Sequence, residues 1–254
     1  MNIVVLLRAG RDPASFTVNR KAQKIFVHRD EWRVTPADLN ALEAALQLAG
    51  SEHTVVAVSI GGPEAQEALY LARAMGAARA LQVAGLAEPE AGQIVAIVNK
   101  ALEHLGGADL VLMGATVHHA DLAQVAPRLA EQLGWPLVDV GLGLQVSGDG
   151  VLVAVADGEV CASRLVRLPA VVTIAEDGNQ PRFAPAPAII RAYADPGAVE
   201  VISASDLGLV EAELRPQVIR RGEVYPPERT FGQRLEGSVD EVAQQLAAEL
   251  WGKA

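Results

Sequence analysis

Residues 54–76 read TVVAVSIGGPEAQEALYLARAMG, and this stretch contains one complete strand, turn and helix. The run Thr54–Ile60 is short and rich in valine, which predicts a buried strand. Gly61-Gly62-Pro63 predicts a tight turn, and the helix that follows ends at Gly76. A buried strand that leads into a helix is the repeating unit of a parallel sheet with crossover helices.

The same alternation of strand and helix continues through about residue 140. Further strands are predicted at Ile3–Leu7, Ala80–Val83 and Leu110–Met113, and a helix at about 90–105. Another helix is predicted to begin with Thr35 as N-cap, Pro36 in the first helical position and Asp38 one turn in. One face of this helix is apolar and is expected to pack on the sheet: Leu39, Leu42, Leu46 and Ala49. The pattern predicts an α/β fold with a parallel sheet.

The second half of the chain has a different pattern. After Trp135-Pro136 the hydrophobic period becomes two, which predicts an inserted β-meander at about 137–167. A buried strand at 168–174 then returns the chain to the main sheet. We therefore expect an α/β domain at 1–178 and, at 179–254, an extended arm that ends in a helix capped by Ser238 and Glu241.

Composition excludes several classes of protein. The formal net charge of -10 argues against a nucleic-acid partner, because phosphate contacts need clustered Lys and Arg. Cys161 is the only cysteine, so no intrachain disulfide and no multi-cysteine metal site is expected. The apolar run at the amino terminus is too short for a signal sequence or a membrane span, so we expect a cytoplasmic protein without direct membrane insertion.

Several ordered motifs carry a resemblance to a known family. Leu168-Pro169-Ala170-Val171-Val172-Thr173 is followed by Pro181-Arg182-Phe183-Ala184, by Asp206-Leu207-Gly208 and by Pro226-Pro227-Glu228-Arg229-Thr230. Together with the closing helix, these motifs resemble the electron-transfer flavoprotein β subunits from end to end. The resemblance implies an adenine-nucleotide α-hydrolase-like (Rossmann-like) domain.

The resemblance also implies a function. Such a subunit is a non-catalytic electron carrier that pairs with an α subunit holding the redox-active FAD, and residues 179–254 would embrace that partner. The heterodimer takes electrons from dehydrogenases and passes them to a quinone oxidoreductase or another acceptor. The β subunit itself holds AMP structurally, or a second FAD in bifurcating relatives. AMP is the expected ligand of this chain.

An adenine nucleotide needs strand ends, helix N-termini and small residues that allow close approach. By position, the resemblance implies a pocket formed by sixteen residues of this chain. They are Leu6, Arg8, Thr35, Pro36, Ala37, Asp38, Ile60, Gly61, Gly114, Thr116, His118, Asp121, Leu122, Ala123, Gln124 and Val125.

Two parts of the chain depart from the family pattern. In the stretch 114–127 a family lysine and a phosphate-side threonine are missing, which is expected to weaken or re-aim phosphate binding unless Arg8, His118 or His119 compensates. The family's partner-recognition segment maps to Pro185-Ala186-Pro187, where Ala186 replaces an anchoring leucine. Alanine buries little apolar surface, so a dedicated electron donor is expected in place of the usual acyl-CoA dehydrogenase.

Other interpretations stay open. Gly61-Gly62-Pro63 is either a phosphate-binding loop or only a tight turn. His118-His119 is more readily a surface or pocket-lining pair than a metal pair, because adjacent side chains diverge and no carboxylate or cysteine set accompanies them. A regulatory, stress-protein-like nucleotide module is an alternative function, although its Gly-x-x-Gly phosphate loop is absent.

Overall fold

The computed structural model describes residues 1–28, 31–86, 89–115, 122–158, 160–195, 197–217 and 232–252. The chain divides into two compact units, one formed by 1–17 with 26–220 and the other by 18–25 with 221–254. The first unit contains the central sheet. Among the described residues, no helix combines the length and apolar character that crossing a membrane requires.

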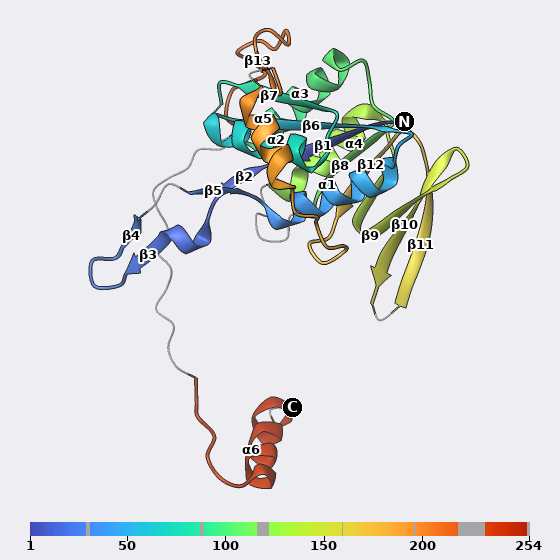
Figure 1. The fold of residues 1–254 in the computed structure, drawn as a ribbon. Coiled ribbons are helices and arrows are strands. Elements are labelled where there is room, and N and C mark those ends of the chain that lie inside the picture. Colours follow the sequence, from blue (N-terminus) through green and yellow to red (C-terminus); the bar gives the residue numbers. More distant parts are fainter. Residues whose placement is uncertain are drawn as a thin grey trace. The chain divides into compact units, whose positions relative to one another are not determined.

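A nine-stranded sheet forms the centre of the first unit (Figure 1). Its strand order is β11-β10-β9-β12-β8-β1-β6-β7-β13. The strands are β1 (Asn2–Leu7), β6 (Thr54–Ile60), β7 (Arg79–Ala84), β8 (Leu110–Gly114), β9 (Leu137–Ser147), β10 (Gly150–Asp157), β11 (Val160–Arg167), β12 (Ala170–Ile174) and β13 (Glu200–Ser203). Seven strands that are adjacent in this order, β9, β12, β8, β1, β6, β7 and β13, pair in parallel with their neighbours. The strand β10 is antiparallel to both β9 and β11.

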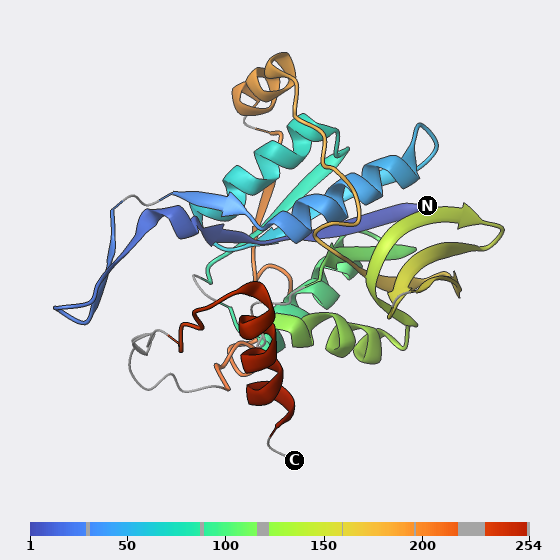
Figure 2. The same ribbon diagram turned by 90° about the horizontal axis from the view of Figure 1, so that it is seen from below.

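Helices cover both faces of this sheet (Figure 2). The helices α1 (Pro36–Ala49) and α2 (Pro63–Met75) pack on one face, and α3 (Ala91–His104) and α4 (Val125–Leu133) pack on the other. Successive side chains of a strand point to opposite faces, so a doubly covered strand is apolar throughout. In β1, for example, Ile3 and Val5 belong to the α1–α2 core and Val4 to the α3–α4 core.

Shorter elements complete the described chain. In the first unit, β2 (Ala9–Arg11) pairs with β5 (Trp32–Val34), and α5 (Ala186–Ala194) packs on α2. The others are η1 (Pro13–Ser15), η2 (Leu122–Gln124), the pair β3 (Phe16–Asn19) and β4 (Lys24–Val27), and α6 (Val239–Trp251) near the end of the chain.

The α/β fold and its elements confirm most of the sequence prediction. The predicted meander corresponds to β9, β10 and β11, and the last helix has the predicted capping box, with the Ser238 amide donating to Glu241 Oε2 at 2.8 Å. Thr35 is the N-cap residue of α1, as predicted, although its side chain makes no hydrogen bond to a main-chain amide of the first turn. Its hydroxyl donates instead to Asp38 Oδ2 at 2.6 Å.

The stretch after residue 178 joins the first unit more closely than the sequence indicated. The sequence predicted an arm outside the domain, whereas β13 extends the sheet through Glu200–Ser203 and the compact unit continues to residue 220. The buried side chains of Val199, Ala204 and Leu209 give this segment an apolar anchor of its own. The sequence pattern was too short and too rich in turns to reveal a strand there.

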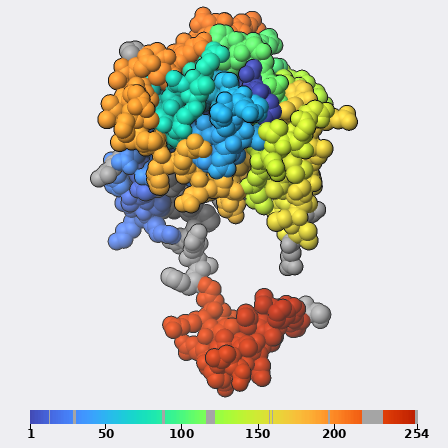
Figure 3. All heavy atoms as spheres, turned by 45° about the vertical axis from the view of Figure 1, so that its right-hand side comes forward, coloured from blue at the N-terminus to red at the C-terminus, as the bar shows by residue number. Residues whose placement is uncertain are grey.

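A polar strap fastens the start of this stretch to α1. Asn40 and Asn179 exchange hydrogen bonds through their amides and main-chain carbonyls, at 2.6 and 2.9 Å. Arg182 donates to the buried Glu43 from Nε at 2.7 Å and from Nη2 at 3.0 Å. Figure 3 shows the orange segment that contains the strap and α5 on the surface beside α1 and α2. Burial alone would raise the pKa of Glu43, but the hydrogen bonds from Arg182 and Gln47 outweigh it and lower the pKa.

We expect Glu43→Gln to reduce the free energy of unfolding at neutral pH by about 2 kcal/mol, because charge-assisted hydrogen bonds are lost. A lowered folded-state pKa stabilises the fold above the unfolded pKa, and this stabilisation disappears as pH falls through the folded value. The difference in the free energy of unfolding between the original protein and the Glu43→Gln variant, measured in urea, should therefore disappear below about pH 4. Exposed Glu131→Gln is the control, and a gap that does not depend on pH would contradict the prediction.

Candidate functional site

The predicted pocket residues lie where the strand order of the sheet reverses. After β1 the chain adds β6 and β7 on one side of it and then crosses to place β8 on the other. In open α/β sheets, ligands bind beyond the carboxyl ends of the strands at such a switch point. Leu6 and Arg8 come from the end of β1, Ile60 and Gly61 from the end of β6, and Gly114 from the end of β8.

The buried carboxylate of Asp38 connects these strand ends to α1. Its Oδ2 accepts hydrogen bonds from the Arg8 amide at 2.9 Å, from Arg8 Nε at 2.8 Å and from the Thr35 hydroxyl at 2.6 Å. Its Oδ1 accepts from the Gly114 amide at 2.7 Å and from Arg8 Nη2 at 2.9 Å. The Asp38 side chain has no exposed area. Four predicted site residues, Arg8, Thr35, Asp38 and Gly114, thus form one network.

The guanidinium of Arg8 is held in this network by its ion pair with Asp38. Burial opposes its charge, but the attraction and hydrogen bonds of Asp38 outweigh burial and raise the pKa of the guanidinium. Its Nη2 also donates to the carbonyl of Gly114 at 3.2 Å. Arg8 therefore positions the ends of β1 and β8, and any contact with a phosphate would share a guanidinium that already binds a carboxylate.

Gly114 must lack a side chain in this arrangement. A Cβ at this position would lie 2.4 Å from the carbonyl carbon of Ala37 and 2.5 Å from the amide nitrogen of Asp38. Both atoms belong to the main chain and cannot rotate away. The end of β8 and the first turn of α1 therefore approach each other closely, as the predicted nucleotide pocket requires.

The Gly61-Gly62 turn after β6 is held by the chain's own polar groups. The Gly62 amide donates to Glu64 Oε1 at 2.8 Å, and the buried Gln82 donates to the carbonyls of Gly61 and Gly62 at 3.0 and 2.7 Å. The Gly61 amide bonds to the carbonyl of Val83. A carboxylate thus occupies the amide that an incoming phosphate would need, which favours the tight-turn interpretation of this motif over a phosphate loop.

A cavity of about 180 Å³ lies beside the network, between β8, η2 and β9. Its lining includes the predicted residues Gly114, Leu122 and Ala123, together with Met113, Ala115, Ala126, Asp139, Val140 and Thr173. The Val140 amide donates to the Thr173 hydroxyl at 2.8 Å, and that hydroxyl donates to Asp139. Val140 has a φ of 57°, which a β-branched residue rarely adopts, and such strain is concentrated at functional sites.

The structure places the remaining predicted residues as follows. Pro36 and Ala37 form the first turn of α1, Gln124 ends η2 and Val125 begins α4. Thr116, His118 and Asp121 lie outside the described residues, as does His119. Pro185, Ala186 and Pro187 lie at the start of α5, on the side of α2. Within the described ranges, no cluster of three or more His, Cys, Asp or Glu side chains has the geometry to hold a metal ion.

Sequence reasoning missed Glu64, Gln82, Asp139 and Thr173. A polar Gln82 inside the apolar run of β7 was the one visible signal, because a buried amide needs partners. Asp139 and Thr173 acquire their roles through a contact between segments 34 residues apart, whereas Glu64 bonds to an amide only two residues away that the sequence pattern did not single out.

These features define a Rossmann-like α/β domain with a site at the switch point. A family model of the electron transfer flavoprotein domain matches residues 24–207. The electron transfer flavoprotein subunit beta of Bacillus subtilis is 31% identical over 259 residues, which span 100% of this chain and 99% of that protein. The bovine (Bos taurus) subunit beta is 35% identical over 80% of each chain, and the acryloyl-CoA reductase electron transfer subunit gamma of Anaerotignum propionicum is 29% identical over 87% of this chain and 86% of that protein. The chain belongs to the electron transfer flavoprotein β-subunit family.

We expect Asp38→Asn to destabilise the fold by about 3–5 kcal/mol, because it leaves the Arg8 charge buried without its counter-charge. Arg8→Gln should also destabilise, whereas the double variant should be less damaged than the sum of the two. Urea unfolding of all four proteins measures this coupling, expected at about 1–3 kcal/mol. Strictly additive effects would show that the pair does not act as a unit.

Gly114→Ala should cost about 2–3 kcal/mol of stability, since the new methyl group must push α1 away from the end of β8. Thermal unfolding measures the loss. The matched control is Gly143→Ala in β9, where a Cβ would meet no atom within 4 Å. Equal melting temperatures for the two variants would contradict the close approach.

Proposed function

We propose that this chain binds AMP at the switch point and supports an FAD-carrying α subunit in electron transfer from a dehydrogenase to a quinone reductase or another acceptor. The observation that carries the proposal is the family match along the whole chain, joined to the gathering of predicted site residues at the carboxyl ends of β1, β6 and β8. By itself the chain would be non-catalytic.

The described residues fit the nucleoside part of such a ligand. Gly114 leaves room at the end of β8, and Ile60 is partly exposed at the end of β6. The Arg8–Asp38 pair carries no net charge, so it would keep the edge of the site rigid without repelling an anion. The phosphate would lie towards Leu122–Val125, since Glu64 already occupies the Gly62 amide. AMP supplies no chemistry in this role and acts as a structural ligand.

A second FAD is the alternative ligand of the same pocket. From the end of the third strand onward the sequence reads Val83-Ala84-Gly85-Leu86-Ala87-Glu88-Pro89, which lacks the Ser-Asp-Arg-rich segment typical of bifurcating relatives and so favours AMP.

The proposal places the α subunit against the end of the chain. In α6 the apolar side chains of Val239, Leu246, Leu250 and Trp251 are exposed. An amphipathic helix with its apolar face uncovered is suited to a partner surface. Ala186 at the start of α5 offers little apolar area to a dehydrogenase, which supports a dedicated donor. One relative of this chain is named as an electron transfer subunit of acryloyl-CoA reductase, and we propose a similarly dedicated partner for this chain.

Co-expression with the α-like subunit, followed by size exclusion and a flavin spectrum, tests the function. We expect a heterodimer with one FAD and, after denaturation, AMP in the extract at about one equivalent. Two FAD per heterodimer would favour the bifurcating alternative. A monomer that binds AMP but no α subunit would favour a regulatory nucleotide-binding module.

A further inference from the structure

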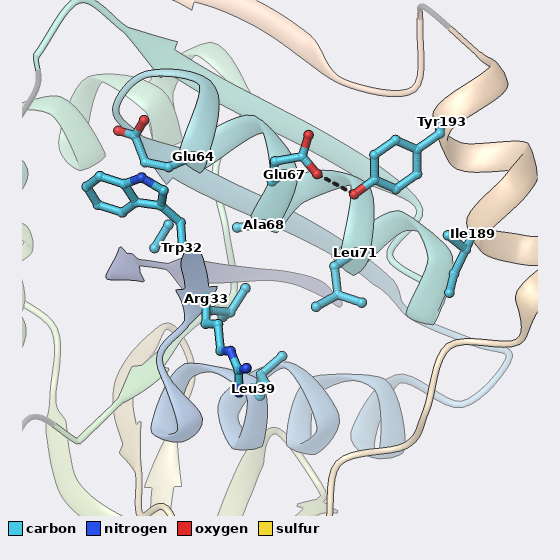
Figure 4. Close-up of a pocket in the computed structure, with 11 residues that line it drawn as sticks. Trp32, Arg33, Leu39, Glu64, Glu67, Ala68, Leu71, Ile189 and Tyr193 are labelled. Atoms are coloured by element: carbon cyan, nitrogen blue, oxygen red, sulfur yellow. Dashed lines mark hydrogen bonds between the residues drawn. The ribbon is translucent and has the colours of Figure 1, made fainter. Parts of the chain in front are cut away.

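A second cavity, of about 360 Å³, is lined by residues of β2, β5, α1, α2 and α5. Its walls are mainly apolar and include Trp32, Leu39, Leu71 and Ile189. Figure 4 shows Trp32 and Glu64 at one end and Tyr193 and Ile189 at the other, with Glu67 between them. All of these residues belong to the first compact unit.

Two carboxylates give this mainly apolar cavity negative charge. Glu64 and Glu67 lie one turn apart on α2 and both line the cavity, and neither has a cationic partner within the described part of the chain. Glu64 accepts from the Gly62 amide, and Glu67 accepts from the Tyr193 hydroxyl. The one lining cation, Arg33, is paired with Asp12 at 2.6 Å. The cavity thus offers two carboxylates to a positive charge.

The Trp32 ring, which lines one end of the cavity, stacks against a cation of this chain, Arg11, which is not itself a lining residue. Its guanidinium carbon lies 4.9 Å from the centre of the Trp32 ring. At the opposite end, Tyr193 is fixed by stacking on Tyr70, with 4.7 Å between ring centres. Burial and the bond to Glu67 raise the pKa of Tyr193 to about 12, so its hydroxyl stays a donor over the physiological range.

Apolar surface continues beyond the cavity onto α5 and the preceding segment. Ile190 is 68% exposed and Phe183 is 95% exposed. A small molecule would fill the cavity and leave these side chains in water, whereas a protein would cover both. Lys and Arg combine an apolar stem with a charged head, which matches apolar walls with carboxylates at one side.

We propose that the α2–α5 cavity binds a partner protein through a Lys or Arg side chain flanked by apolar residues, the charged head meeting Glu64 and Glu67. The dehydrogenase donor of the proposed function is the natural source of such a segment, and to that extent the inference rests on that function. Recognition here would then use a cavity of this chain in place of a protruding anchor at Ala186.

The test uses the full-length chain and two peptides that carry fluorescein on the amino terminus: Leu-Arg-Leu-amide and its citrulline analogue, which keeps the shape but not the charge. Fluorescence anisotropy should give about tenfold tighter binding for the arginine peptide than for the citrulline peptide, equivalent to about 1.4 kcal/mol. The NMR indole signal of Trp32, assigned with Trp32→Phe, should shift with the arginine peptide.

The variant Glu64→Gln/Glu67→Gln should remove the preference for arginine. Glutamine keeps an oxygen to accept from the Gly62 amide and the Tyr193 hydroxyl, so the fold is expected to survive. Glu131→Gln on the opposite face of the sheet is the control and should retain the preference. Equal binding of the arginine and citrulline peptides, or an arginine preference that survives in the double variant, overturns the proposal.

Different experimental results would contradict the cavity proposal and the proposed function. A heterodimer without flavin would reject the electron-carrier role, while the peptide experiment on the chain alone would still report on the cavity. A normal flavin content with no arginine preference would reject only the cavity.

Discussion

The carboxylate of Asp38 is buried where the ends of β1 and β8 meet the first turn of α1, and a buried charge is tolerated only when it is paired and hydrogen-bonded. That constraint determines its neighbours. Arg8 must follow β1 with its guanidinium turned inward, Thr35 must present a hydroxyl, and the amide of Gly114 must approach within 2.7 Å. The close approach in turn allows no side chain at residue 114. The geometry of the proposed nucleotide site is therefore a consequence of satisfying one carboxylate.

The same chemistry recurs at the next strand end. Glu64 binds the Gly62 amide as Asp38 binds the Gly114 amide, so the chain's own carboxylates occupy two of the main-chain donors at the carboxyl edge of the sheet. Glu64 also lines the cavity between α2 and α5. One side chain thus joins the turn at the end of β6 to the surface where we place a partner. The first turn of α2 therefore contributes both to the strand ends near the proposed nucleotide site and to the cavity proposed for a partner.

The stretch after residue 178 contributes to the first unit in three places. The strap at Asn179 and Arg182 holds it on α1, α5 packs on α2, and β13 completes the sheet edge. These contacts give α5 a fixed position, with Tyr193 stacked on Tyr70 and bonded to Glu67. A rigid α5 is what a recognition surface requires, because ordering a loose helix at each encounter would cost binding free energy.

The sequence by itself determined the parallel sheet, the meander and the capped last helix, because hydrophobic period, Gly and Pro turns and capping pairs act over a few neighbouring residues. The family resemblance also predicted Arg8, Thr35, Asp38 and Gly114 as site residues, without indicating that they bond to one another. Only the tertiary structure decided that Arg8 pairs with Asp38 and that both side chains bond to Gly114. Arg8 is 30 residues from Asp38 and 106 from Gly114, and contacts of that range depend on how strands and helices pack, which no local pattern records.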